Sequence, residues 1–244
     1  MSKTPTMRLD RMLANLGYGS RREIHQLVDA EEVMLDGKPL DDANQRIAVT
    51  PDLPQRMTVM GQAVDPPPPV VVLLHKPLGV VCSHKEPGRR VYDLLPPRWR
   101  VRDPALSTVG RLDKETSGLL LITDDGDFLH RVISPRRHVA KSYVATLDRP
   151  LTGAEAAVFA AGTLMLEGEE KPLMPAQLEV LSEREARLTI HEGRYHQVRR
   201  MFAAVGNHVN ALHRDRIGGL ALPEDLPAGE HRVLDKATAE SVFS

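Results

Sequence analysis

The chain of 244 residues is poor in cysteine and in aromatic side chains. Its one cysteine, Cys82, excludes an intramolecular disulfide framework and fits a reducing cytoplasm. Phe, Tyr and Trp make up only 4% of the residues, which argues against a multi-aromatic stacking platform for single-stranded nucleic acid. The longest purely aliphatic run, Val70 to Leu74, is far shorter than the ~20 residues of a membrane span. These absences favour a cytosolic, globular protein that does not cross a membrane.

Metal and nucleotide motifs are also missing, although the chain holds 10 histidines. The closest useful pairings, His191 with His196 and His208 with His213, are five residues apart. That spacing suits neither a helical ligand pair nor a zinc motif. The chain has no phosphate-binding loop, no complete dinucleotide fingerprint and no Gly-x-Ser-x-Gly elbow. We therefore expect no metal site.

The formal net charge is only −1, but the charges are distributed unevenly along the chain. Residues 84–111 hold seven basic and three acidic side chains, and 131–149 and 194–216 each hold five basic and one acidic. The compensating acid lies in 148–192, with nine acidic and four basic residues. This pattern is consistent with a basic face that attracts phosphate, although an ordinary solvated surface would also explain the charge runs taken alone.

The N-terminal quarter of the chain is predicted to form a small module of two helices followed by short strands. Residues 1–7 carry no pattern and are expected to be disordered. Apolar residues at helical spacing predict a helix over 8–16. Ser20, with a glutamate three residues later, is typical of a capping box that starts a second helix. Asp36-Gly37, between two apolar runs, predicts a β-hairpin.

Four consecutive prolines within 63–69 predict a semi-rigid linker, and hence one domain over 1–62 and another over 70–244. The second domain is predicted to be α+β, with a mixed, mostly antiparallel sheet and flanking helices, because strand patterns outnumber helical ones. Thr152 and Glu155 form a second capping-box pattern. Strands are expected at 70–74, 118–123, 141–147, 177–181, 187–190, 209–212 and 232–234, and helices at 152–159, 196–205 and from 235 onward.

Three short clusters carry the chemistry: 110–121 (GRLDKETSGLLL), 141–143 (KSY) and 193–200 (GRYHQVRR). Each alone has a structural explanation, as a turn, a core strand or the solvated start of a helix. Together, in this order and spacing, they resemble the three signature motifs of pseudouridine synthases, which isomerise uridine in RNA. The most similar group, the RsuA type, modifies ribosomal RNA and carries an N-terminal S4 RNA-binding domain.

The resemblance extends over nearly the whole chain. Residues 8–10 (RLD) and 20–23 (SRRE) are similar to the opening of an S4 domain. Residues 76–79 (KPLG) are similar to the turn that begins the catalytic domain in this group. The segments 201–208 and 212–219 most resemble the member that acts on small-subunit ribosomal RNA.

The resemblance implies a role for each motif. Asp113 is the essential carboxylate, which either attacks C1′ of the target nucleotide or removes its C2′ proton. Arg199 would form an ion pair with Asp113 and keep it ionised. Tyr143 would stack under the uracil, and Leu119, Leu120 and Leu121 would close the pocket to water.

The target base must leave the RNA stack before its atoms can react. The resemblance assigns Arg111 to the vacated space, where its planar guanidinium would replace the base. It implies neither a metal ion nor an organic cofactor. The further residues expected to bind RNA are Lys76, Arg8, Arg21, Arg22, Arg136, Arg137, Arg194 and His196.

The predicted activity is isomerisation of one uridine, position 516 by the resemblance, in 16S ribosomal RNA. The expected partner is that RNA within a small-subunit assembly intermediate, met by a monomeric enzyme in the cytoplasm. Two alternatives remain: a synthase acting on 23S ribosomal RNA, which would share the motifs, and a non-catalytic S4-type RNA-binding factor for ribosome assembly. The combination of Asp113, Tyr143 and Arg199 argues against the second alternative.

Overall fold

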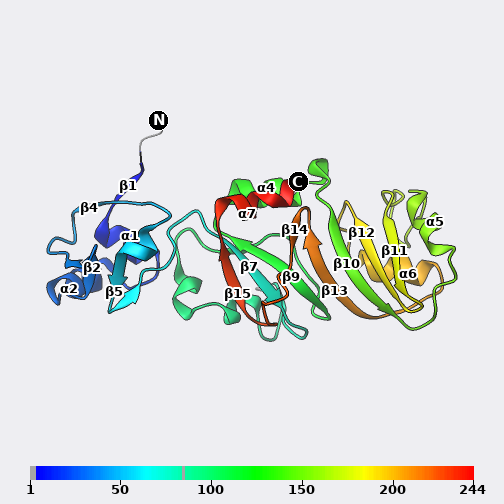
Figure 1. Cartoon of the computed structure of the whole chain (residues 1–244), viewed down its shortest axis with the longest axis horizontal. Helices are drawn as coiled ribbons and strands as arrows, with labels where there is room; N and C mark the ends of the chain where they lie inside the picture. The colour runs from blue at the N-terminus through cyan, green and yellow to red at the C-terminus, as the bar shows by residue number, and fades with distance from the viewer. Residues whose placement is uncertain (1–3, 84–85) are drawn as a thin grey trace. The chain divides into compact units, whose positions relative to one another are not determined.

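The computed structural model describes residues 4–83 and 86–244 (Figure 1). The chain divides into two compact units. The first holds the chain up to Val70 together with Leu95–Ser107 and Thr123–Asp125, and the second holds Val71–Leu94, Thr108–Ile122 and Gly126–Ser244. The first unit is therefore not built from the N-terminal sequence alone.

The first unit contains two short helices and two small antiparallel sheets. Its elements are β1 (Thr6–Arg8), α1 (Leu9–Asn15), α2 (Arg21–Asp29), β2 (Val33–Leu35), β3 (Lys38–Pro39), β4 (Arg46–Ala48), α3 (Leu53–Arg56), β5 (Met57–Val59), β6 (Gln62–Ala63) and the 3-10 helix Pro97–Val101. β1 pairs with β4, and the other four strands form a sheet in the order β3-β2-β5-β6. Leu13 and Ile24, both fully buried, join the two helices to one apolar core.

Two local predictions for this unit are confirmed and one is wrong. Ser20 and Glu23 form the capping box, with the serine hydroxyl accepting from the Glu23 amide and the Glu23 carboxylate accepting from the Ser20 amide. Asp36 and Gly37 take φ angles of 50° and 75° at the tip of the β2–β3 hairpin, the conformation of a type I′ turn. The predicted disorder over residues 1–7 is wrong for the described part, since β1 begins at Thr6; residues 1–3 lie outside the described chain.

The 3-10 helix Pro97–Val101 is fastened to the N-terminal part of the first unit. The Arg98 guanidinium binds both carboxylate oxygens of Asp65, with Nη2 2.9 Å from Oδ1, and lies 4.9 Å from the centre of the Tyr18 ring. Gly17 is required beneath this helix, because a Cβ there would stand 2.4 Å from the Arg98 carbonyl oxygen. The first unit thus includes a segment far along the chain, whereas the sequence predicts a first domain that ends at residue 62.

One sheet of nine strands organises the rest of the chain. Its strands are β7 (Val71–Lys76), β8 (Ser107–Thr108), β9 (Thr116–Thr123), β10 (Lys141–Leu147), β11 (Gln177–Ser182), β12 (Glu185–Ile190), β13 (Val209–Ile217), β14 (Leu220–Ala221) and β15 (His231–Leu234). The main order is β11-β12-β10-β13-β9-β7-β15, with β14 beside β13 and β8 beside β9. β9 and β13 run parallel. Antiparallel pairing joins β10 to β12, β10 to β13, β11 to β12 and β7 to β15. The predicted α+β class with a mixed, mostly antiparallel sheet is confirmed.

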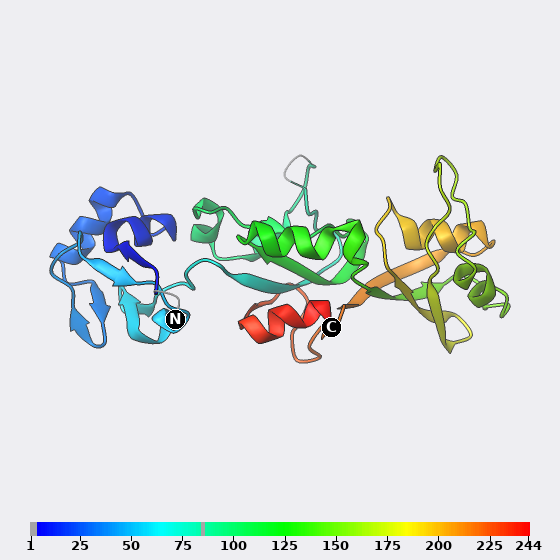
Figure 2. The ribbon, with the colours of Figure 1, turned by 90° about the horizontal axis from the view of Figure 1, so that it is seen from above.

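The helices of the second unit are α4 (Gly126–Ile133), α5 (Glu155–Ala160), α6 (Gln197–Ala204), α7 (Lys236–Glu240) and the short 3-10 helices Val91–Leu94, Pro135–Arg137 and Ser241–Phe243. α4 contacts the C-terminal helices through the rings of Phe128 and Phe243, whose centres are 5.8 Å apart. Figure 2 shows α4 in green and α7 in red close to each other. α5 meets α6 through Phe159 and Phe202. These contacts anchor the helices on which parts of the functional site depend.

Two helix predictions for this unit need correction. The capping box at Thr152 is wrong: Ala154 is the N-cap of α5, and Gly153 takes a φ of +91°. The Glu155 carboxylate still accepts hydrogen bonds from Thr152 and Gly153, so the side chains interact without starting the helix there. The second correction is α4, a helix that is absent from the sequence prediction. Its buried Phe128 and Val132 lie four residues apart on one helical face.

Candidate active site

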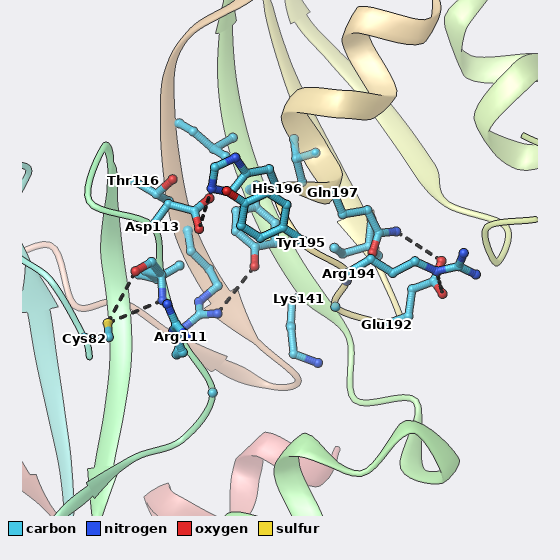
Figure 3. A pocket seen from close by; sticks show the side chains of 18 of the residues that line it. Cys82, Arg111, Asp113, Thr116, Lys141, Glu192, Arg194, Tyr195, His196 and Gln197 are labelled. Carbon is cyan, nitrogen blue, oxygen red and sulfur yellow. Dashed lines mark hydrogen bonds and ion pairs between the residues drawn. The ribbon is translucent and has the colours of Figure 1, made fainter. Parts of the chain in front are cut away.

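The second unit contains a cavity of about 1090 Å³ in which the three sequence motifs converge. Its walls come from the loop before β9, from one face of β10, from the segment that leads into α6, and from β13. Leu112, Ile190 and Leu212 contribute apolar surface, and all lining residues belong to the second unit. Figure 3 shows Asp113, His196 and Lys141 around this cavity, each carried by a different motif.

Lys76 organises the loop that presents Asp113. This lysine is fully buried at the end of β7, and its amino group donates to the carbonyl oxygens of Asp113 at 3.0 Å and Thr116 at 2.8 Å. It also donates to the carbonyl oxygen of Pro77. Burial lowers its pKa from the ordinary lysine value. The expectation that Lys76 binds RNA is therefore wrong, because its charge is enclosed and its hydrogens are used on the backbone.

The Asp113 side chain is accessible from the cavity, with 39% of its surface exposed. Its Oδ1 lies 3.4 Å from Nε2 of His196. The imidazole stacks in turn on the ring of Tyr195, with ring centres 3.9 Å apart (Figure 3). His196 takes a left-handed φ of 48° immediately before α6, which turns its side chain toward the carboxylate and delays the helix to Gln197. His196, expected as an RNA-binding residue, thus contacts the expected catalytic carboxylate directly.

Arg199 does not form the expected ion pair with Asp113. Its Nη1 donates to the carbonyl oxygen of Val209 and its Nη2 to that of Glu115, both at 2.7 Å. The guanidinium therefore links α6 to the start of β13 and to the Asp113 loop. The correction has a simple physical reason: two carbonyl acceptors in fixed positions use the donors that the sequence alone assigned to a carboxylate.

Tyr143 and two cations form another side of the cavity. Tyr143 lies opposite Arg214 in the β10–β13 ladder, and Nη1 of Arg214 is 3.4 Å from the phenol oxygen. Lys141, two residues before Tyr143 on β10, also lines the cavity. Burial lowers the pKa of Lys141 to about 8, and the nearby positive charge of Arg214 adds to this effect. Lys141 and Arg214 lie in segments that carry the family resemblance, but neither residue is assigned a role from the sequence alone.

The expected hydrophobic wall is formed by other residues than those predicted. Leu119, Leu120 and Leu121 are fully buried on β9 and do not line the cavity. Leu119 and Leu121 pack in the apolar core with α4 and α7. The run of three leucines is a central strand, whose hydrophobicity reflects burial on both faces of the sheet.

Three of the arginines expected to bind RNA in the second unit are exposed. Arg111 is 67% exposed and bonds to the Glu86 carboxylate at 2.8 Å. Arg136 and Arg137 lie in the exposed 3-10 helix that follows α4. The three residues directly before them in the sequence, Ile133–Pro135, line the cavity. Arg136 and Arg137 therefore follow a segment of the cavity wall.

Arg194 is occupied within the protein. Its guanidinium donates to Glu192, Glu169 and the carbonyl oxygens of Lys171 and Pro172. These bonds tie the segment after α5 to the third motif. The described contacts give Arg194 a structural role beside the cavity, and its binding to RNA stays a prediction.

Two of the three expected RNA-binding residues of the first unit bond to one buried carboxylate. Arg8 and Arg21 both donate to Asp10, which is 1% exposed, while Arg22 is exposed on α2. Burial raises the pKa of Asp10, but the hydrogen bonds from Arg8 and Arg21 outweigh it and hold the pKa at about 2. The carboxylate therefore holds two half-exposed guanidinium groups side by side.

Among residues 4–83 and 86–244, no group of three or more His, Cys, Asp or Glu side chains is arranged to hold a metal ion. No helix formed by these described residues is long and apolar enough to cross a membrane. The buried Cys82 bonds to the Leu112 backbone beside the cavity, and burial raises the pKa of its thiol.

Comparison with known families identifies both parts of the chain. Residues 70–204 match the family described as RNA pseudouridylate synthase, which is more than half of the chain. The chain belongs to this family. Residues 7–50 match the S4 domain, which lies within the first unit. The synthase is therefore an isomerase that converts uridine in RNA to pseudouridine.

Individual relatives and one solved structure agree with this assignment. The synthase is 41% identical over 237 residues to the ribosomal small subunit pseudouridine synthase A of Vibrio cholerae, covering 97% of this chain and all of that protein. It is also 41% identical over 239 residues to the protein of the same name in Escherichia coli strain K12, again covering 97% of this chain and all of the relative. A crystal structure of a pseudouridylate synthase covers 97% of this chain and 99% of its own, with 34% identity and a TM-score of 0.68.

Proposed function

We propose that this synthase converts uridine 516 of 16S ribosomal RNA to pseudouridine, within a small-subunit assembly intermediate. Support for the substrate comes from near-full-length similarity to proteins named ribosomal small subunit pseudouridine synthase A. The observation that carries the chemistry is the cavity that joins all three motifs around the exposed carboxylate of Asp113. The enzyme acts as a monomer in the cytoplasm and uses no metal or organic cofactor.

The reaction breaks the N1–C1′ bond of uridine, turns the base and joins C5 to C1′. Asp113 either attacks C1′ and forms a covalent ester, or removes the C2′ proton and leaves a glycal. In both routes the bonding pair of the broken N1–C1′ bond stays on the uracil. When C5 bonds to C1′, the Asp113 carboxylate is released from the ester, or the C2′ proton is returned to the glycal. The C5 proton is then lost and N1 takes up a proton, so the product is an isomer of the substrate.

The residues around Asp113 position it for this step. His196 contacts Oδ1 from the side of the third motif. Lys76 and Arg199 fix the backbone from Asp113 to Glu115, through the carbonyl oxygens of these two residues. Because these contacts come from β7 and α6, the carboxylate is oriented by elements distant in sequence. Preorganisation of this kind contributes to catalysis by limiting the conformations of the reacting group.

The base reaches Asp113 only after it is extruded from the RNA. Tyr143 provides the ring on which the uracil stacks, and Arg111 fills the space that the base leaves. Exposed Arg136 and Arg137 bind phosphates beside the cavity. Arg8, Arg21 and Arg22 of the S4 domain add further phosphate contacts.

The test is to map pseudouridine in ribosomal RNA from cells with the gene, without it, and with the gene carrying Asp113→Asn. The expected result is one modification, at position 516 of 16S RNA, that is lost in both altered strains. Loss of a site in 23S RNA would overturn the proposed substrate. An unchanged map would overturn the proposed function in these cells.

A further inference from the structure

The buried guanidinium of Arg214 is a feature that the motif roles leave unexplained. Arg214 is only 2% exposed, yet it borders the cavity. Its Nε donates to the carbonyl oxygen of Leu119 at 2.9 Å and its Nη1 approaches the phenol of Tyr143. Its Nη2 is buried and has no hydrogen-bond partner among the described residues. A buried donor that is left unpaired destabilises the fold, so its retention needs an explanation.

Among the described residues, no carboxylate forms an ion pair with Arg214. Asp215, its neighbour on β13, pairs with Arg187, and within the described chain Arg214 itself contacts a carbonyl oxygen and a phenol. The positive charge of Arg214 also helps to lower the pKa values of two other cations, Lys76 and Lys141. A buried charge without a counter-ion is strongly unfavourable. This side of the cavity is therefore complete only when a negatively polarised group enters it.

The backbone is built to place Arg214 there. Gly118 lies opposite Arg214 in the parallel β9–β13 pair, and a Cβ on Gly118 would stand 2.2 Å from the Arg214 carbonyl oxygen. Gly118 also takes a φ of +112°, which other residues rarely adopt. On the other side Arg214 faces Tyr143 across the β10–β13 ladder. Close packing of three central strands thus fixes the guanidinium beside the Tyr143 phenol, with Cζ 5.9 Å from the ring centre.

From this geometry we propose that Arg214 is a further catalytic residue, which donates from Nη2 to a carbonyl oxygen of the uracil and stabilises the anion formed when the N1–C1′ bond breaks. A base that stacks on Tyr143 presents its edge to the group that already contacts the phenol oxygen. The departing uracil carries the bonding pair, and its negative charge spreads onto its carbonyl oxygens. Arg214 transfers no proton: it supplies a fixed positive charge and one hydrogen bond. Lys141 adds a second charge to the same side of the cavity.

The uracil anion fits this site better than an RNA phosphate does. A phosphate is strongly hydrated and bound at the surface, where exposed Arg111 and Arg136 are available. Arg214 lies beneath the surface, beside an aromatic ring. The two ligands also predict different defects, since loss of a phosphate contact weakens RNA affinity and loss of leaving-group stabilisation slows the chemical step.

The experiment compares Arg214→Met with Arg232→Met in single-turnover assays on saturating RNA that contains the target uridine. Arg232 is an exposed arginine of β15, paired with Asp225 and outside the cavity lining. Removing one preorganised donor to a developing anion lowers the rate by about 100-fold or more, so we expect that loss for Arg214→Met and none for Arg232→Met. RNA affinity should stay within about threefold for both variants, because no phosphate contact is removed.

A second substrate separates leaving-group stabilisation from a structural role. Fluorine at C5 makes uracil a more acidic and therefore better leaving group. The rate loss of Arg214→Met, measured as consumption of the target nucleoside, should then be at least about fivefold smaller than with uridine. An equal loss on both substrates would mean that Arg214 only supports Tyr143, and a loss confined to affinity would mean that it binds phosphate. Either result overturns the proposal.

Arg214→Lys is the second variant, for the case in which Arg214→Met does not fold. It keeps the positive charge and removes Nη2. If Arg214→Met unfolds at assay temperature, the same comparison is made with the lysine variant, for which we expect a smaller loss of about tenfold with the same dependence on fluorine. The inference rests on the proposed function only for the choice of RNA. Wild-type enzyme that modifies 23S but not 16S RNA would overturn the proposed substrate, and the rate comparison would then decide on Arg214 with 23S RNA.

Discussion

The side chains of His196 and Asp113 meet at 3.4 Å although the two residues are 83 positions apart in the chain. The contact joins the third motif to the first across the cavity, and it takes the place that sequence reasoning gave to Arg199. Tyr195 holds the imidazole by stacking on it. We therefore expect the orientation of the carboxylate to depend on His196, and the position of its loop to depend on Arg199.

Asp113→Asn should abolish pseudouridine formation, because an amide neither attacks C1′ nor accepts the C2′ proton at a useful rate. The substitution removes one partly exposed charge, so thermal stability and RNA affinity should stay close to wild type. Product formation by purified protein is the measurement. Activity within about tenfold of wild type would show that another group is the essential carboxylate.

His196→Ala should lower the single-turnover rate by about 10- to 100-fold through loss of orientation of Asp113. The matched control is His208→Ala, an exposed histidine outside the cavity lining, which should leave the rate unchanged. Affinity for RNA distinguishes the two roles considered for His196. A variant that binds RNA weakly but reacts normally at saturation would show that His196 contacts RNA and does not position Asp113.

Arg199→Ala should destabilise the second unit, since it leaves the carbonyl oxygens of Val209 and Glu115 without their donor. Loss of hydrogen bonds from a charged donor costs about 1–3 kcal/mol. The control is Arg137→Ala, which should weaken RNA binding and leave stability unchanged because Arg137 is exposed. Calorimetric unfolding of both variants tests this pair. Equal transition temperatures for Arg199→Ala and wild type would show that water replaces the guanidinium.

Asp10→Asn should destabilise the first unit by about 2 kcal/mol at pH 7, because folding holds the pKa of Asp10 at about 2 instead of 3.8. A carboxylate with a lowered folded pKa stabilises the fold above its unfolded pKa and loses that contribution as the pH falls through the folded value. The difference between wild type and variant should thus shrink between about pH 4 and pH 2. Asp36→Asn, at an exposed ion pair, is the control. A difference independent of pH would assign the effect to shape and not to charge.

Lys141→Met should stabilise the protein at pH 7, because burial lowers the pKa of this lysine from 10.5 to about 8. Folding then disfavours the charged amine below pH 8, and the penalty disappears as the pH rises from about 8 to 10.5. The stability gain should be about 2 kcal/mol or less at pH 7 and should vanish near pH 10.5. Unfolding curves at both pH values give the comparison. A variant less stable than wild type at pH 7 would show that the amine is well solvated.

Local structure was predictable where neighbouring residues decide it. The Ser20 capping box and the Asp36-Gly37 hairpin need only residues close in sequence, and both are present. The capping box at Thr152 failed because Gly153 adopts a conformation outside the helical region. The three motifs border one cavity, although they lie far apart in the sequence.

The partners of charged side chains were not predictable. Lys76, Arg194 and Arg199 look alike in the sequence as basic residues of RNA-binding motifs, but each directs its hydrogens to carbonyl oxygens of distant segments. Such acceptors have no sequence signature, because every residue carries one. The free donor of Arg214 is hidden for the same reason: only the folded chain shows which backbone oxygens are taken and which donor remains.

The contact between Arg98 and Asp65 bears on how synthases could exchange RNA-binding modules. The first unit includes Leu95–Ser107, which follows the first strand of the large sheet in the chain. A recombination event with a single crossover before residue 70 would bring in a foreign partner for Arg98 and a foreign residue at Gly17. Viable chimaeras are therefore those in which both parents carry a compatible 95–107 segment, so that the S4 module and this insert are inherited together.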